Sequence, residues 1–98
     1  DMLTEVEAAR FLIYRTWWLL NKGERCMKEA ALAKAYVVEV AERAASKAVE
    51  IHGAYGLSRE YPVERYYRDA KTWSFPDGAT EIMKLIVGRE VLGISAIV

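Results

Sequence analysis

Few residues in this 98-residue chain can bind a metal, form a disulfide or bend the backbone. It has one cysteine, Cys26, one histidine, His52, and two prolines. One cysteine cannot form an intrachain disulfide, and one cysteine with one histidine cannot build a structural zinc site. We therefore expect no metal and a reducing, cytoplasmic-type compartment. The 53% hydrophobic content argues against disorder.

An excess of one charge sign is also missing. The 14 Lys and Arg residues balance 14 Asp and Glu residues, so the formal net charge is zero. Nucleic-acid binding needs a basic excess, and the basic-aromatic string at residues 64–68 is interleaved with an acid. No uncharged run approaches the ~18 residues of a membrane span, and no basic start precedes an apolar block. We expect neither a nucleic-acid partner, a membrane span nor a signal peptide.

Apolar residues recur every three or four positions, which is typical of amphipathic helices. The spacing predicts long helices over Met2–Asn21, Glu24–His52 and 77–92, and a short helix from Pro62 to Lys71. No segment alternates at period two. The predicted fold class is therefore all-α, an antiparallel helical bundle with three long helices, one short helix and short loops.

The apolar surface exceeds what so short a chain can bury by itself. The second helix carries an apolar stripe, with Lys34 inside it, whose head group we expect to pair or to reach solvent. Trp17, Trp18 and Trp73 are interpreted as core or interface residues. We expect the chain to self-associate or to face another domain. The stripe consists of Met27, Ala30, Ala31, Val37, Val38, Ala41, Ala44, Ala45, Ala48 and Ile51.

Motifs in the second half resemble the acyl-CoA dehydrogenase family. They read IHGAYGL at 51–57, EYPVER at 60–65, YRDAK at 67–71, DGATEI at 77–82 and IVGRE at 86–90. Their order and gaps match the family's C-terminal helical domain over residues 1–98. The resemblance implies a four-helix bundle whose first helix is missing here, in a fragment of a parent about four times longer.

The resemblance also implies a chemistry, the FAD-dependent oxidation of the Cα–Cβ bond of an acyl-CoA thioester. A carboxylate at the start of the last helix removes the α-proton, and Asp77 occupies that position where the family commonly has Glu. Gly78 then lies against the thioester. Asp is also a preferred helix N-cap, so Asp77 is either cap and base together or a cap alone.

The same resemblance assigns the FAD contacts, which the family makes to a cofactor bound by a neighbouring subunit. Glu50 replaces a common Gln there, Ala54 a common Gly and Ala79 a common Thr, and each change weakens the assignment. His52 also suits a purely structural place at a helix C-terminus. The candidate cofactor residues are Glu50, Ile51, His52, Gly53, Ala54, Ala79, Thr80 and Glu81.

The expected function is that of one domain in such a dehydrogenase, inactive alone. Its partners are the acyl-CoA substrate, an electron-transfer flavoprotein and further copies in a dimer or tetramer, in the cytoplasm or a mitochondrial matrix. The alternatives are a non-catalytic assembly module of the same ancestry, or a related flavoprotein acting on other CoA thioesters or nitroalkanes. Glu64, Arg65, Arg68 and Asp69, and separately Arg89 with Glu90, are interpreted as ion pairs.

Overall fold

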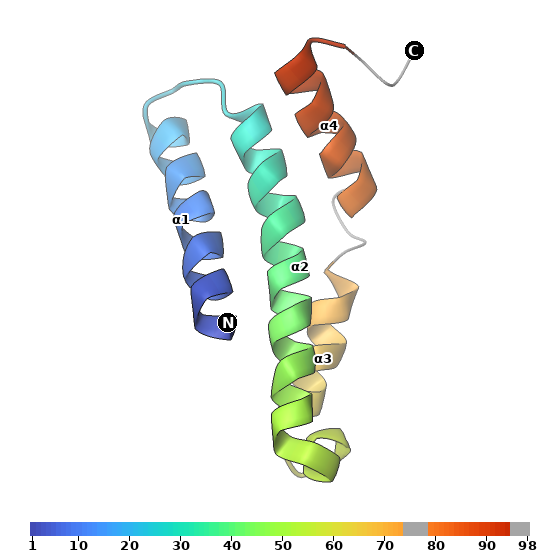
Figure 1. Ribbon diagram of the computed structural model, residues 1–98. Helices are drawn as coiled ribbons and strands as arrows, with labels where there is room; N and C mark the ends of the chain where they lie inside the picture. Colours follow the sequence, from blue (N-terminus) through green and yellow to red (C-terminus); the bar gives the residue numbers. More distant parts are fainter. Residues whose placement is uncertain (74–78, 95–98) are drawn as a thin grey trace.

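The computed structural model describes residues 1–73 and 79–94, and in these ranges the chain is helical with no strand. Its elements are α1 (Met2–Asn21), α2 (Met27–His52), the 3₁₀ helix η1 (Gly53–Leu57), α3 (Val63–Thr72) and α4 (Thr80–Leu92). The predicted all-α class is confirmed. Figure 1 shows α1 antiparallel to α2 on one side, with α3 and α4 following one another along its other side.

The turn between α1 and α2 is longer than the sequence suggested. Helix α1 ends at Asn21, as predicted, and Gly23 follows with φ 74°. The Glu24 N–H then donates to the Leu19 carbonyl at 3.2 Å, so Glu24 still belongs to the turn. Helix α2 therefore begins at Met27, three residues later than expected, and ends at His52 as expected.

Helix α4 also begins later than predicted. The helix was expected to open at Asp77, but Ala79 is the N-cap, with ψ 155°, and Thr80 is the first helical residue. Alanine has no side-chain oxygen, so Ala79 itself makes no side-chain cap. Residues 74–78 lie outside the described part of the chain. The other end is confirmed: Gly93, with φ 71°, donates its N–H to the Arg89 carbonyl at 2.8 Å after Leu92.

Helix α2 is the centre of the fold. It contacts α1, η1, α3 and α4, whereas α1 contacts neither α3 nor α4 in the described residues. At about 1.5 Å per residue its 26 residues span roughly 39 Å. The longest dimension of the molecule is 48 Å. The fold is thus a thin layer of helices, and every tertiary contact between the long elements includes α2.

The core is small and made of small side chains. Of the predicted stripe, Ala31 and Val38 are buried, but Ala30, Ala41 and Ile51 are exposed. No described element covers these positions of α2. Trp17, Trp18 and Trp73 were interpreted as core or interface residues, and each is more than half exposed, so they lie outside the core of this chain and their interface role stays a prediction. The buried apolar residues are Ala9, Leu19, Ala31, Ala33, Ala35, Val38, Val40, Val63 and Ala70.

Ion pairs between elements fix the helices around α2. Arg43 of α2 donates to Glu5 of α1, with Nη2 2.7 Å from Oε2, and this hydrogen bond raises the pKa of the Arg43 guanidinium. Lys71 of α3 lies 2.7 Å from a carboxylate oxygen of Glu42, and that hydrogen bond likewise raises the pKa of the Lys71 ammonium. Each pair links α2 to a different neighbour.

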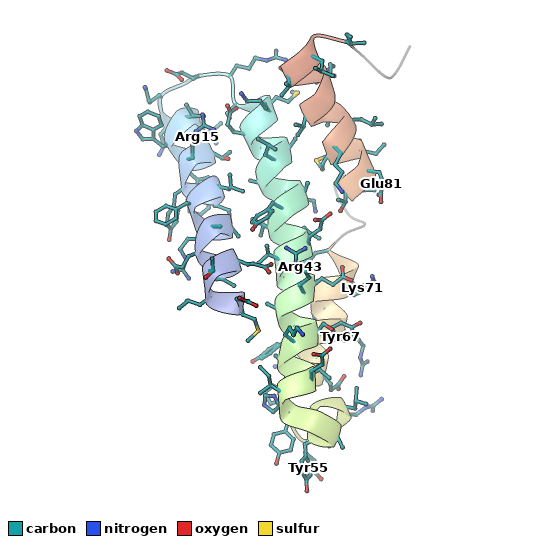
Figure 2. All side chains as sticks on the ribbon, viewed as in Figure 1. Arg15, Arg43, Tyr55, Tyr67, Lys71 and Glu81 are labelled. Atoms are coloured by element: carbon teal, nitrogen blue, oxygen red, sulfur yellow. The ribbon has the colours of Figure 1, made fainter. Side chains whose placement is uncertain are left out.

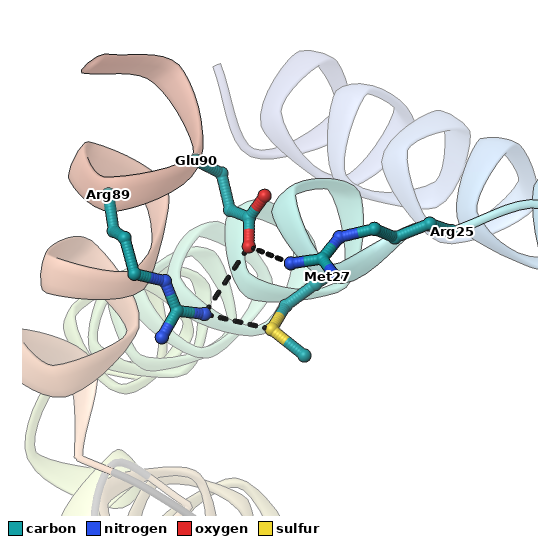
Figure 3. Close-up of polar contacts among 4 residues, drawn as sticks. All are labelled: Arg25, Met27, Arg89 and Glu90. Carbon is teal, nitrogen blue, oxygen red and sulfur yellow. Dashed lines mark hydrogen bonds and ion pairs between the residues drawn. The ribbon is translucent and has the colours of Figure 1, made fainter. Parts of the chain in front are cut away.

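A second group of polar contacts joins the start of α2 to the end of α4 (Figure 3). Arg25 Nη2 donates to Glu90 Oε1 at 2.6 Å, and Arg89 Nη2 lies 3.3 Å from the same oxygen. Arg89 Nη2 also lies 3.0 Å from the Met27 sulfur. The predicted Arg89–Glu90 ion pair is confirmed, and Lys34 pairs as expected, with Nζ 3.0 Å from the Trp73 carbonyl oxygen.

Candidate functional site

The predicted base and its neighbour lie in a gap between two described elements. Asp77 and Gly78 are outside the described residues, while Trp73 ends α3 and Ala79 precedes α4. The first N–H groups of a helix have no partner inside the helix, and they carry the positive end of its dipole. Ala79 and Thr80 are half-buried at this end of α4, and Glu81 is exposed. This end can stabilise a developing negative charge.

The predicted glycine turn is the sharp end of α2. Gly53 stops the helix with φ 63°, a conformation that favours glycine, and a Cβ there would meet no atom within 4 Å. Gly56 is required for a different reason, which is lack of space. A Cβ there would press on the Val49 backbone and would lie 3.0 Å from the Val49 Cα. One glycine provides an open backbone surface, and the other lets η1 fold tightly against α2.

The side chains at this turn are exposed around a small aromatic cluster. Ile51 is 71% exposed and Tyr55 is 66% exposed. Tyr61 lies between two rings, with its centroid 5.7 Å from that of Tyr55 and 6.2 Å from that of His52. His52 Nδ1 lies 2.8 Å from the Ala48 carbonyl oxygen of its own helix, so the imidazole also caps α2. The exposed surface is thus mixed aromatic and apolar.

The charge of Glu50 is paired locally. Lys47 Nζ lies 3.2 Å from Glu50 Oε2 at the last turns of α2, and both side chains are about two-thirds exposed. The sequence pattern treated Glu50 as an isolated negative charge where the family has a neutral amide. A lysine three residues earlier on a helix is a signal for this pair that could have been used.

The sequence reasoning missed a hollow beside the turn. Arg59, Arg65 and Arg68, with Tyr61, Pro62, Glu64 and Asp69, line an open hollow of about 360 Å³. Of the expected ion-pair cluster, the Glu64–Arg68 pair is present at 2.8 Å, and Arg65 lies over the Tyr66 ring instead. The hollow is formed by α3 and the loop that precedes it, and residue spacing alone does not specify the path of that loop.

The two groups of candidate cofactor residues do not come together within one chain. Figure 2 places Tyr55 at one end of the molecule, beyond the end of α2, and Glu81 at the start of α4, with α3 between the two levels. Residues 50–54 and residues 79–81 therefore form two separate surfaces. In the parts of the chain that the structure describes, no group of acids, cysteine and histidine could hold a metal. None of the described helices is long and apolar enough to cross a membrane.

Comparison with known proteins identifies the family in which this arrangement of helices occurs. Residues 1–92 match the family model described as acyl-CoA dehydrogenase, C-terminal domain. The chain belongs to the acyl-CoA dehydrogenase family. An acyl-CoA dehydrogenase of Bacillus subtilis strain 168 is 46% identical over 93 residues, which are 95% of this chain and 24% of that protein. This acyl-CoA dehydrogenase domain thus spans about a quarter of the length of that relative.

Two further likenesses bear on this member of the acyl-CoA dehydrogenase family. The three-dimensional structure of butyryl-CoA dehydrogenase from Megasphaera elsdenii superposes with a TM-score of 0.92 at 39% identity, over 94% of this chain and 24% of that chain. The caffeyl-CoA reductase–Etf complex subunit CarC of Acetobacterium woodii is 37% identical over 92 residues, 94% of this chain and 24% of that protein. The predicted family and its domain are confirmed.

Proposed function

We propose that this chain is the C-terminal helical domain of an FAD-dependent enzyme that oxidises the Cα–Cβ bond of an acyl-CoA thioester. The match of residues 1–92 to the family's C-terminal domain carries the proposal. FAD accepts the β-hydrogen as hydride in this reaction. The chain supplies two surfaces, one at the start of α4 and one at the end of α2, and alone it does not turn over.

At the start of α4, Asp77 is the general base that removes the α-proton, and Gly78 lies against the thioester. The thioester carbonyl gains negative charge as the proton leaves, and backbone N–H groups at a helix start are placed to stabilise such a charge.

At the end of α2, residues 50–54 contact the FAD of a neighbouring subunit. The features of this turn fit such a role. Gly53 leaves an open backbone surface, Ile51 is exposed for an apolar contact, and the Lys47–Glu50 pair reduces repulsion of a pyrophosphate by Glu50. Ala79, Thr80 and Glu81 contact FAD from the other surface. The separation of the two surfaces along α2 supports contact with cofactors in two different subunits.

The partners follow from the same proposal. The enzyme is a homo-oligomer, a dimer or a tetramer, in the cytoplasm or a mitochondrial matrix. An electron-transfer flavoprotein accepts its electrons, a role supported by the likeness to a subunit of an Etf complex. The exposed apolar residues of α1 and of the turn support contacts with further protein.

A second candidate is a non-catalytic assembly module of the same ancestry. The absence of a side-chain oxygen at the Ala79 N-cap and the methyl group of Ala54 in the glycine turn favour it, because both depart from the family's cofactor residues. The residues that precede this domain in the same polypeptide distinguish the two candidate functions. A β-domain with flavin-binding residues there supports the enzyme, and an unrelated domain supports the module.

The experiment that tests the proposed chemistry changes Asp77 in the full-length flavoprotein. Asp77→Asn removes the carboxylate and is expected to slow flavin reduction by acyl-CoA about 10²–10⁴-fold, the usual effect of losing a general base. Bleaching of the flavin is followed across a panel of acyl-CoA chain lengths. Asp77→Glu is the control with the family's usual reach: it matches or exceeds the parent rate if the pocket follows the family's pattern, and it is slower if the pocket is built around the shorter side chain. A parent rate in Asp77→Asn shows that the base lies elsewhere.

A further inference from the structure

Lys34 of α2 reaches a backbone carbonyl at the end of α3. Its Nζ donates a hydrogen bond to the Trp73 carbonyl oxygen at 3.0 Å, although the two residues are 39 positions apart in the sequence. Trp73 is the C-cap of α3. The last carbonyls of a helix have no partner inside the helix and carry the negative end of its dipole, so a lysine ammonium stabilises this end.

Lys34 lines a mostly apolar hollow between α2 and α4. The hollow has a volume of about 370 Å³, and Lys34 is the only charged residue among the described residues that line it. The side chain is half-buried there. A half-buried ammonium needs hydrogen-bond acceptors, and the Trp73 carbonyl provides one. The lining residues are Met27, Ala30, Ala31, Lys34, Met83 and Ile86.

Hydrogen bonds hold Trp73 more than burial does. Its indole is 58% exposed, so apolar burial contributes little to its position. Its N–H donates to the Ala70 carbonyl at 3.3 Å, which is a contact within the end of its own helix. The hydrogen bond from Lys34 connects the same residue to α2, the helix that contacts every other element. The position of Trp73 relative to α2 therefore depends on Lys34.

Trp73 and Ala79 are the described ends of the connection from α3 to α4, which contains Asp77 in the sequence. Ala79 is held by its own helix, because its carbonyl accepts the Met83 N–H at 3.1 Å in the first turn of α4. Figure 1 shows α3 and α4 following one another along α2, with the end of α3 facing the start of α4. Lys34 thus contacts the residue from which this connection begins.

We propose that Lys34 is a positioning residue for the proposed base, because its hydrogen bond to the Trp73 carbonyl fixes where the connection containing Asp77 leaves α3. In this role Lys34 acts through the backbone of Trp73 and not by contact with the substrate. A misplacement of about 1 Å can cost about 10²-fold in rate, so a small shift at Trp73 is sufficient. The inference rests on the proposed function, in which Asp77 removes the α-proton.

The test measures flavin reduction by acyl-CoA in the full-length flavoprotein under single-turnover conditions. Lys34→Met keeps an apolar stem and removes the hydrogen-bond donor. Its limiting rate of flavin reduction is expected to fall about 10–100-fold, while the acyl-CoA concentration that gives half of this rate changes less than about twofold. Lys34→Arg keeps a donor and is expected to recover most of the parent rate.

Arg43→Met is the matched control, since it removes the hydrogen bond of another α2 cation, the one from Arg43 to Glu5 of α1 at 2.7 Å. It is expected to keep the parent rate. All rates are divided by the concentration of bound flavin, so a loss of folded enzyme does not enter them. Equal losses in Lys34→Met and Arg43→Met overturn the proposal, because any loosening of the helices then has the same effect. A change in the half-saturating concentration alone also overturns it.

A double variant separates this inference from the proposed function. If Lys34 acts through Asp77, then Lys34→Met does not slow flavin reduction further in the Asp77→Asn protein, because the carboxylate that it positions is gone. The same fold-loss with and without Asp77 overturns the inference and leaves the base role of Asp77 intact. A parent rate in Asp77→Asn alone overturns the proposed function, and the inference with it.

Discussion

Lys47 and Glu50 form an ion pair of 3.2 Å on the last turns of α2, next to the glycine turn. The pair offsets the charge of the residue that most departs from the family's pattern at the proposed FAD surface. A substitution of Glu50 alone would both remove its charge and release Lys47. Changing each of the two residues in turn distinguishes these effects.

A charge series at this pair tests the FAD surface in the full-length flavoprotein. Lys47→Gln leaves Glu50 without its lysine and is expected to weaken FAD binding about 2–5-fold, the size of an exposed ion-pair effect. The double variant Lys47→Gln with Glu50→Gln removes both charges and returns the affinity to the parent value. Fluorescence titration of the apoprotein with FAD measures both. Unchanged affinity in Lys47→Gln indicates that Glu50 lies away from the cofactor.

The isolated chain is expected to bind FAD weakly or not at all. The two candidate surfaces lie at different levels along α2, so one chain offers a cofactor only one surface at a time. Equilibrium dialysis against FAD at micromolar concentration measures the binding. A stoichiometric yellow complex that survives purification of the 98 residues would contradict the division of the site between subunits.

Two glycine substitutions should change stability in opposite directions. Gly56→Ala places a methyl group against the Val49 backbone, which cannot move without displacing α2, and is expected to destabilise the fold by about 1–3 kcal/mol. Gly88→Ala adds a methyl group in open space inside α4 and is expected to stabilise it by about 0.5–1 kcal/mol. Urea unfolding measures both free energies, and a Gly56→Ala variant as stable as the unchanged chain would contradict the tight η1 turn.

The Arg25–Glu90 contact should make the free energy of unfolding depend on pH in the acid range. The hydrogen bond from Arg25 lowers the pKa of the Glu90 carboxyl below its ordinary value of 4.5. A lowered folded-state pKa contributes stability that is complete above pH 4.5 and is lost as the pH falls through the folded value. Arg25→Gln removes the first cause of the shift, so the pKa of Glu90 rises and this acid-dependent stability shrinks.

NMR titration of the Glu90 carboxyl carbon, with urea unfolding between about pH 2 and 6, checks this expectation. The unfolding free energies of the unchanged chain and Arg25→Gln should converge at the acid end. Arg59→Gln is the matched control because Arg59 has no ion pair within the described ranges. A constant difference between the two chains over the whole range would show that Arg25 acts on stability by another route.

The sequence predicts where the helices lie and where they end, but it does not predict which of their faces a neighbouring helix covers. Helices α2 and α4 end at His52 and Leu92, as predicted, and each is followed by a glycine with positive φ, which is a local property. The starts of α2 and α4 were predicted three residues early, because charged and capping residues in a turn resemble a first helical turn. Ala30 and Ala41 were assigned to an apolar stripe, and both are exposed, because whether a neighbour covers a stripe depends on other elements.

The same division holds for the candidate site. The motif spacing identified the family, and its glycine turn has the positive φ that such a motif requires. Spacing did not indicate the cluster of His52, Tyr55 and Tyr61, nor the arginine-lined hollow, because both depend on the path of the loop between η1 and α3. The roles of Asp77 and Gly78 remain predictions, and these residues lie outside the described ranges.

The central position of α2 has a consequence for how the domain opens. Since α1 touches α2 alone among the described helices, α1 can detach while α2, α3 and α4 stay together. Helix α2 cannot detach in the same way, because every contact between two α-helices of the described chain includes α2. Amide hydrogen exchange should therefore divide the chain into two cooperative units, with α1 exchanging through a partial opening and the α2 amides exchanging last.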